Sequence, residues 1–338
     1  MIKIAVIIPY YQQREGILRR ALTSVLEQEI GVDIQVEVIV VDDGSPVPAE
    51  TEVAGLQFIE PHRLTILSQP NGGVGVARNT GLHYFDEDVR YIAFLDSDDI
   101  WKPQHLSQAI NTLEQGYDYY FCDCRRLGSK KSIFEERDFA QFLYSTGAKA
   151  LSDTVYSIDK DAFYAFSLRK RPSMIPAIVY RRSVAGELAF DTSLHVAGED
   201  CLFLFQLIAR CKNISCSLDE LVTCADGVNI YAGKAGWNNP GHLVRQMGSL
   251  LALYKFTQKL SLSPKDENFL KAKIKMVRQV FAFLTLRYFI KYRELWPSEL
   301  SRMTRRDSQF RIWYPLSILY VAVCYPLGLY DPLKEVPA

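Results

Sequence analysis

Largely apolar runs and polar clusters alternate along the first hundred residues of the chain. The runs cover Ile4–Ile8, Val36–Val41 and Tyr91–Leu95, and each stops abruptly at polar or aromatic residues. Between the first two runs, apolar side chains recur at helical spacing from Ile17 to Leu26. Runs of this kind are typical of strands buried on both faces of a parallel sheet. The pattern therefore predicts an α/β fold with a mostly parallel, Rossmann-like sheet flanked by helices.

Three carboxylates follow the third run within four residues: Asp96, Asp98 and Asp99. Open α/β sheets bind ligands beyond the carboxyl ends of their strands, so these acids are expected at a binding edge. Crowded carboxylates repel one another unless they share a cation, and hard oxygen ligands suit Mg²⁺ or Mn²⁺. The alternative is that Asp98 and Asp99 cap a helix that begins at Lys102.

Polar or aromatic residues also follow the other two predicted strands. Pro9 and Tyr11 follow the first, and Asp42 and Asp43 follow the second, directly before a glycine and a serine. Both strands thus deliver such groups to one edge of the sheet. The alternative for the second cluster is a plain turn, since aspartate and glycine favour turns.

A glycine-rich segment, residues 71–81, leads into a predicted helix. Glycines let a backbone approach a ligand closely, and the amides at a helix start attract anions. The segment lacks the dinucleotide fingerprint, because Arg78 stands where the third glycine belongs, and the chain has no G-x-x-x-x-G-K-[S/T] loop. It is interpreted either as a flexible turn or as a loop that shapes a nucleotide pocket, with Arg78 available to a base, ribose or phosphate.

Taken in order, these segments resemble the family 2 glycosyltransferases. The matching motifs read I-I-P-Y-Y, V-I-V-V-D-D-G-S, N-G-G-V-G-V-A-R-N-T-G, F-L-D-S-D-D-I-W and, later, G-E-D-C-L-F. The resemblance covers roughly the first two thirds of the chain, and its specificity comes from the ordered set. It implies the GT-A nucleotide-diphospho-sugar transferase fold and an inverting transfer from a nucleotide-diphosphate sugar, with a UDP-sugar the expected donor, to an acceptor hydroxyl.

The resemblance also implies how the donor is held. Tyr11, beside Pro9, takes the place of the aromatic residue that stacks on the base, and Asp42 and Asp43 inherit the contacts to base and ribose. Asp96 would face the ribose or the metal. Its neighbour Asp98 would coordinate the divalent cation, Mn²⁺ or Mg²⁺, that bridges the two phosphates and neutralises charge on the leaving diphosphate.

In the family the E-D element supplies the general base, which by position is Asp200, with Glu199 beside it at the nucleotide-sugar site. Such a base takes the proton from the acceptor hydroxyl as that oxygen attacks the anomeric carbon. An apolar run from Leu202 to Ile208 follows, so Asp200 is expected at the start of a helix packed on the sheet. The alternative is an acidic residue that is favoured in a first helical turn by the helix dipole.

Composition limits the classes of partner that the chain is expected to bind. The chain has 338 residues and a formal net charge of zero, so nothing indicates nucleic acid as a partner. Its seven cysteines are scattered, without C-x-x-C spacing, and fit a reducing cytoplasm. The five histidines form no paired ligand pattern. About half of the residues are apolar, enough for a sizeable core and an appendage.

Three regions are expected: a catalytic domain over residues 1–225, a lid or linker over 226–242, and a helical region over 243–338. The middle segment is rich in glycine and carries Lys234 and Trp237, which could close over the diphosphate. The uncharged stretch Ile312–Tyr330 is interrupted by Pro315, Pro326 and Gly328, which leave an unbroken run too short to span the ~20 residues that a bilayer needs. The helical region is interpreted either as a bundle packed on the catalytic domain or, from its basic and aromatic residues, as peripheral at the cytoplasmic face of a membrane.

The acceptor is the least constrained partner. Residues 122–190 carry a less regular pattern, with a basic turn expected over residues 168–172 and an interrupted strand from Ser173 to Tyr180. A saccharide or lipid-linked acceptor in polysaccharide or glycolipid biosynthesis fits the resemblance. Two other functions stay open: a nucleotidyltransferase of GT-A-like fold, whose usual G-x-G-T-R-type loop is absent, and a non-catalytic nucleotide-sugar-binding protein.

Overall fold

The computed structural model describes residues 1–225, 241–292, 301, 303–305 and 307–332. It divides into two compact units. The first unit comprises residues 1–192 together with 203–225. The second comprises residues 193–202 and the described residues from 241 onward. Residues 226–240 of the expected lid, with Lys234 and Trp237, lie outside the described residues, and its last two residues, 241 and 242, are helical.

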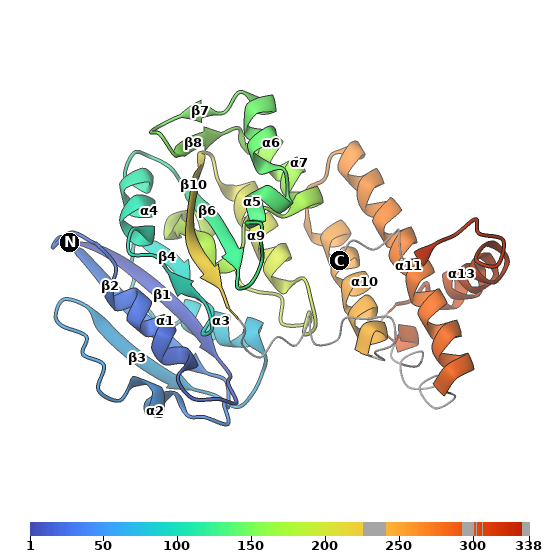
Figure 1. Ribbon diagram of the computed structural model, residues 1–338, viewed down its shortest axis with the longest axis horizontal. Helices are drawn as coiled ribbons and strands as arrows, with labels where there is room; N and C mark the ends of the chain where they lie inside the picture. Colours follow the sequence, from blue (N-terminus) through green and yellow to red (C-terminus); the bar gives the residue numbers. More distant parts are fainter. Residues whose placement is uncertain (226–240, 293–300, 302, 306, 333–338) are drawn as a thin grey trace. The chain divides into compact units, whose positions relative to one another are not determined.

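The first unit is built on one mixed sheet of ten strands in the order β3-β2-β1-β4-β9-β6-β10-β8-β7, with β5 paired to β10 (Figure 1). Strands β1 to β4 are parallel, and β9 runs antiparallel to both β4 and β6. The strands are β1 Ile2–Tyr10, β2 Ile34–Asp42, β3 Arg63–Ser68, β4 Tyr91–Phe94, β5 Ile100–Trp101, β6 Tyr119–Arg126, β7 Lys149–Ala150, β8 Val155–Ile158, β9 Ile178–Arg181 and β10 Ile214–Cys224.

Helices cover both faces of this sheet. Side chains of β1 alternate between two apolar clusters: Ile4 and Val6 pack with α1 and α4, whereas Ala5 and Ile7 pack with α3 and α9. This alternation is what a strand buried on both faces requires. The helices are α1 Ile17–Leu26, α2 Ala49–Val53, α3 Val74–Leu82, α4 His105–Leu113, α5 Ile133–Glu136, α6 Phe139–Thr146, α7 Lys160–Lys170, α8 Arg182–Ala185 and α9 Glu199–Arg210, with a 3₁₀ turn, η1, at Ile175–Ala177.

Two local predictions between β8 and β9 were wrong. The basic turn expected from residue 168 begins only at Arg171, because α7 is capped by the Asp159 side chain and continues to Lys170. Arg171 adopts a left-handed conformation and a proline follows, which ends the helix. The strand expected from Ser173 begins only at Ile178, after the 3₁₀ turn that contains Pro176.

The second unit contains the C-terminal helices α10 Gly241–Lys259, α11 Pro264–Tyr292 and α13 Phe310–Cys324. Helix α11 packs on both of the others, around an apolar cluster that includes Leu250, Phe281, Trp313 and Val321. The predicted C-terminal helical extension is therefore present. Of the helices in the described ranges, none combines the length and the apolar character that crossing a bilayer demands.

Candidate active site

The carboxyl ends of β1, β2 and β4 meet at one edge of the sheet, as predicted. Tyr10 is the register partner of Asp42, and the Leu95 amide donates to the Ile7 carbonyl across the next pair of strands. Gln12 links the three strand ends. Its backbone amide donates to Ser45 Oγ (2.8 Å), and its side-chain Nε2 donates to Ser97 Oγ (3.2 Å). One buried glutamine thus ties together the loops that follow all three strands.

Asp42 holds the loop that follows β2. Its Oδ1 accepts a hydrogen bond from the Ser45 amide (2.7 Å) and its Oδ2 accepts one from the Ala49 amide (2.9 Å). The side chain is buried, and both oxygens engage backbone donors. Asp42 therefore fixes the course of the chain from β2 into α2, and its contact to base or ribose stays a prediction.

Asp43 organises the glycine-rich loop. Its Oδ1 accepts from Gln69 Nε2 (2.7 Å) and from the Gly72 amide (2.8 Å), and its Oδ2 accepts from the Gly73 amide (2.8 Å). Thr80 Oγ1 in turn donates to Gln69 Oε1 (2.6 Å). A single buried carboxylate thereby fixes the course of the loop up to the start of α3. This order favours a loop that shapes a pocket over a flexible turn.

Close packing explains why position 81 is a glycine. A Cβ atom added at Gly81 would lie 2.5 Å from Cγ2 of Ile7, so α3 lies directly against β1. Gly73, the residue before α3, has a φ of +90°, a conformation that side chains other than glycine rarely adopt. Gly81 thus lets the end of α3 lie against β1, and Gly73 permits the turn that precedes the helix.

Arg78 and Asp96 form an ion pair within this edge. Arg78 projects from α3 and is buried, and its Nη2 donates to Asp96 Oδ1 at 2.8 Å. Its guanidinium also lies over the ring of Phe190, 5.2 Å from the centroid. The side chain of Asp96 keeps 31% of its surface exposed. Arg78 therefore orients Asp96 from the protein interior, and its predicted role toward a nucleotide stays a prediction.

Asp98 and Asp99 occupy different surroundings. Asp98 is half-buried, whereas Asp99 is buried and its Oδ1 accepts the Ala225 amide at 3.0 Å. Burial raises the pKa of Asp99 well above its ordinary value, and the nearby Cys224, Asp96 and Asp98 raise it further. The capping alternative is not observed: α4 begins at His105, and no side chain caps it.

The predicted metal site consists of carboxylates alone. Within the described residues, no group of three or more His, Cys, Asp or Glu side chains has the geometry of a complete metal cage. A magnesium-type ion keeps several waters and takes one or two carboxylates together with substrate phosphates. The exposed part of Asp96 and the half-buried Asp98 offer hard oxygens of that kind, so their donor chemistry fits such an ion, and coordination by them stays a prediction.

The predicted aromatic platform follows β1. Pro9 is buried within the strand, opposite Val41, and Tyr11 comes directly after the strand and is half-buried. Tyr11 is therefore at the same edge as Asp42 and Asp43. The ordering of this edge by Gln12, Ser45 and Ser97 was missed from the sequence, because a lone glutamine or serine carries no motif.

Glu199 and Asp200 belong to the second unit, together with residues 193–202. They form the first turn of α9, and Asp200 Oδ1 accepts the Cys201 amide at 2.7 Å. Helix α10 packs closely on this segment. A Cβ at Gly198 would lie 2.5 Å from Cβ of Ala252, and one at Gly248 would lie 2.9 Å from Cβ of Val196. The segment that carries the predicted base is thus held by the C-terminal helices.

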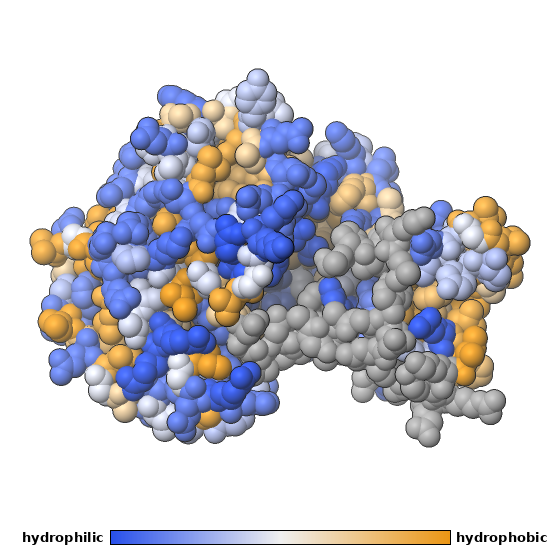
Figure 2. All heavy atoms as spheres, in the orientation of Figure 1, coloured by the Kyte–Doolittle hydropathy of each residue, from blue (hydrophilic) through white to orange (hydrophobic). Residues whose placement is uncertain are grey.

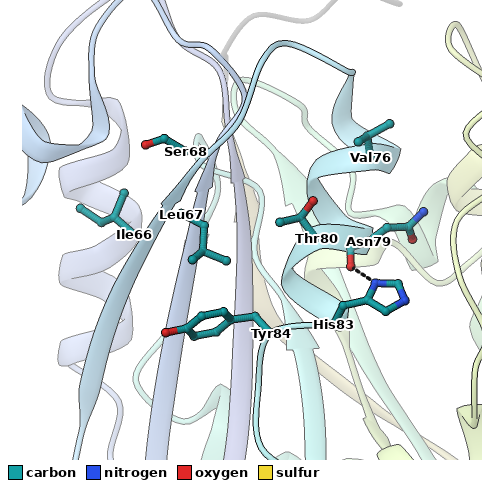
Figure 3. Close-up of a pocket in the computed structure, with 8 residues that line it drawn as sticks. All are labelled: Ile66, Leu67, Ser68, Val76, Asn79, Thr80, His83 and Tyr84. Atoms are coloured by element: carbon teal, nitrogen blue, oxygen red, sulfur yellow. Dashed lines mark hydrogen bonds between the residues drawn. The ribbon is translucent and has the colours of Figure 1, made fainter.

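An open groove of about 650 Å³ lies between β3 and α3 (Figure 3). It is lined by Ile66, Leu67, Ser68, Val76, Asn79, Thr80, His83 and Tyr84. Of the predicted site residues it contains none. Two of its lining residues adjoin the sheet edge: Ser68 is the register partner of Asp42, and Thr80 donates to Gln69, which donates to Asp43.

Comparison with known proteins identifies the family. Residues 5–174 match the sequence model described as "Glycosyl transferase family 2". The chain belongs to this family. It is 32% identical over 256 residues to the succinoglycan biosynthesis protein ExoW of Rhizobium meliloti (strain 1021), covering 75% of this chain and 78% of ExoW. The chain is therefore a glycosyltransferase, as its motifs predict.

Two other relatives of this family 2 glycosyltransferase carry the names of a poly(ribitol-phosphate) transferase and of a teichoic acid biosynthesis protein. The Staphylococcus aureus (strain N315) poly(ribitol-phosphate) beta-N-acetylglucosaminyltransferase TarP is 28% identical over 221 residues, covering 65% of this chain and 61% of TarP. The minor teichoic acid biosynthesis protein GgaA of Bacillus subtilis (strain 168) is 36% identical over 119 residues, 35% of this chain and 25% of GgaA. The chain thus spans less than two thirds of either protein.

Solved structures confirm the GT-A fold. S. aureus TarS 1–349 in complex with UDP-GlcNAc superposes with a TM-score of 0.63 at 18% identity, covering 97% of this chain and 93% of that one. The mannosyltransferase PcManGT from Pyrobaculum calidifontis, in complex with GDP-Man and Mn²⁺, gives 0.52 at 17% identity, covering 98% and 81%. At such identities the likeness concerns the fold alone.

Proposed function

We propose that this glycosyltransferase moves a sugar, with inversion at the anomeric carbon, from a nucleotide-diphosphate sugar to an acceptor hydroxyl in polysaccharide or glycolipid biosynthesis. The observation that carries the proposal is the common edge of β1, β2 and β4. There Asp42, Asp43 and Asp96 are each held in place by the protein. Parallel α/β sheets bind ligands at such an edge.

The donor would lie along this edge. Tyr11 would stack on the base, and Asp42 and Asp43 would set the two loops that surround base and ribose. A UDP-sugar is the proposed donor, since TarS, which shares the fold, was crystallised with UDP-GlcNAc. Glu199 is placed with the nucleotide-sugar contacts through the E-D motif that it shares with the family.

A divalent cation, Mn²⁺ or Mg²⁺, would be held by Asp98 together with Asp96, and it would neutralise the charge that the departing diphosphate acquires. Arg78 would support this metal site, because its guanidinium holds one oxygen of Asp96 in place. The buried partner orients Asp96 before any ligand arrives.

Asp200 would act as the general base. Its carboxylate accepts the proton of the acceptor hydroxyl while that oxygen bonds to the anomeric carbon and the bond from that carbon to the diphosphate oxygen breaks. The Cys201 amide holds Oδ1, which fixes the carboxylate at the first turn of α9. Because a single displacement occurs, an α-linked donor gives a β-linked product. The acceptor is proposed to be a saccharide or a lipid-linked saccharide.

The experiment is a thermal-shift panel of nucleotide sugars with and without Mn²⁺, followed by NMR of the product of the best-binding donor. We expect Mn²⁺-dependent stabilisation by one nucleotide class and a product of inverted configuration. A retained configuration would refute the single displacement. Release of pyrophosphate from a nucleoside triphosphate and a sugar phosphate would favour the nucleotidyltransferase, and binding without turnover on any saccharide acceptor would favour the non-catalytic binder.

A further inference from the structure

One side of α13 presents a stripe of aliphatic side chains to solvent. Ile312, Leu316, Leu319 and Val323 recur at helical spacing and are between 51% and 69% exposed. We call this stripe the outer face of α13. Figure 2 shows hydrophobic side chains gathered there. The turn that follows α13 extends the stripe with Leu327 and Leu329, which are also exposed.

The opposite side of the helix is already occupied. Phe310, Trp313 and Val321 are buried in the apolar cluster with α11, and Asp307 accepts a hydrogen bond from Trp313 Nε1 at 2.6 Å. A helix at the surface of a protein normally turns charged residues outward once its apolar side is packed. Helix α13 is apolar on both sides. The aliphatic side chains of the outer face therefore do not contribute to the core of the second unit, and exposed apolar surface of this kind marks an interaction site.

The fully exposed charges around the outer face are basic in the described part of the C-terminal region. Between residues 308 and 330 the sequence contains a single charged residue, Arg311, which is exposed. Arg305 is also exposed, whereas Asp307 is buried and Asp331 is half-buried. Tyr320 and Tyr325 add exposed rings of the type that settles at the level of lipid head groups. The stripe itself thus combines aliphatic side chains with tyrosines and arginine and contains no acid.

We propose that the outer face of α13 docks flat on the surface of an anionic membrane, with its aliphatic side chains in the head-group region and Arg305 and Arg311 toward anionic lipids. A helix of 15 residues is ~22 Å long, shorter than the ~30 Å hydrocarbon core, so it lies on the bilayer and does not cross it. Partial burial of aliphatic side chains together with attraction of basic residues is the combination that holds interfacial helices.

A second copy of the chain is the competing occupant. Two outer faces could bury each other's aliphatic side chains. Such a pairing, however, offers the arginines no acidic partner from the facing stripe, whereas anionic lipids do. Charge complementarity therefore favours the membrane. The inference does not depend on the identity of donor, base or metal.

The test is flotation of the full chain with vesicles of phosphatidylcholine alone and of phosphatidylcholine mixed with phosphatidylglycerol. We expect binding to the mixed vesicles, reduced by salt. Replacing Leu316 and Leu319 together by glutamate should weaken binding at least about tenfold, because two aliphatic groups are lost and like charge is added. Arg311→Gln should weaken binding to the mixed vesicles a few-fold and leave binding to the neutral ones unchanged.

The control is Val32→Glu, which places one such glutamate at a valine of the first unit that is 99% exposed. It should bind vesicles as the unchanged chain does. Circular dichroism melting checks that all variants fold, and light scattering at increasing concentration follows dimers. The proposal is overturned if the unchanged chain does not float with anionic vesicles, if Val32→Glu weakens binding as much as the paired leucine change, or if that paired change only dissolves a dimer.

Discussion

The edge of the sheet in the first unit and the Asp200 segment in the second are stabilised in different ways. At the sheet edge, Asp42 and Asp43 accept hydrogen bonds from backbone amides of the loops that they organise. The segment around Asp200 instead owes its position to close packing, with Gly198 against Ala252 of α10. Donor recognition is thus proposed to rest on polar loops, and chemistry on a segment that the C-terminal helices support. Changes in one region should leave the function of the other intact.

The largest effect is expected at Asp200. Asp200→Asn keeps the shape and polarity of the side chain but removes its capacity to accept the proton. We expect kcat to fall by about 10²–10⁴ while donor affinity is retained. Steady-state kinetics with a saturating donor, combined with calorimetry, would measure both. Near-normal turnover in this variant would exclude Asp200 as the base.

Gly198→Ala should show how far catalysis depends on the position of the Asp200 segment, because it leaves the Asp200 carboxylate itself unchanged. The added methyl group meets Ala252 at 2.5 Å, so the Asp200 segment must shift, and misplacing a reacting group by about 1 Å can cost ~10² in rate. Donor affinity should not change. Ala252→Gly in the same chain removes the clash and should restore most of the rate.

The control for this change is Gly116→Ala. Gly116 has a φ of +98°, close to the +91° of Gly198, but no atom lies within 4 Å of its added Cβ. It therefore carries the same backbone strain without the clash. Equal loss of kcat in both variants, or no rescue by Ala252→Gly, would show that α10 does not position the base.

Asp43→Ala tests the polar side of the comparison. It removes the acceptor of the half-buried Gly72 and Gly73 amides, and hydrogen bonds to a charged group contribute about 1.5–3 kcal/mol each. We expect the free energy of unfolding to fall by about 3 kcal/mol and donor affinity to weaken with it, as measured by urea denaturation and calorimetry. Asp43→Asn keeps one accepting oxygen and should lose less. Unchanged stability in the alanine variant would mean that the loop is ordered by other contacts.

Gly81→Ala should have the smallest effect. Its methyl group would press on Ile7, and overpacking of this kind costs about 1–3 kcal/mol. A double-mutant cycle with Ile7→Ala checks the cause, since the cost of Gly81→Ala should shrink once the isoleucine side chain is gone. Additive costs would contradict direct contact between α3 and β1.

The sequence predicted the parts of this molecule that depend on short-range pattern. The three central strands, helix α1 and the gathering of Asp42, Asp43 and Asp96 at one edge follow from apolar runs that end in acids. The family followed from the order of the motifs and is confirmed. The short strand β5 could not be predicted, because its two residues are strand only through pairing with β10, more than a hundred residues later.

Two features of the site depend on contacts that no local pattern encodes. The ion pair of Arg78 with Asp96 joins a helix to a strand end, and the sequence around Arg78 does not reveal this partner. The packing of Gly198 and Gly248 between the Asp200 segment and α10 joins residues that were assigned to different regions of the chain. Glycine spacing alone does not reveal the partner of such a contact.

The most direct test of the proposed division is a calorimetric titration of UDP, with and without Mn²⁺, into the unchanged chain, Asp98→Asn and Asp200→Asn. The unchanged chain should bind more tightly with Mn²⁺. Asp98→Asn should lose at least about tenfold of that Mn²⁺-dependent affinity, because an amide is a poor substitute for a hard anionic ligand. Asp200→Asn should keep all of it. Unchanged Mn²⁺-dependent affinity in Asp98→Asn, or an equal loss in both variants, would contradict the assignment of donor and metal binding to the sheet edge and of chemistry to the Asp200 segment.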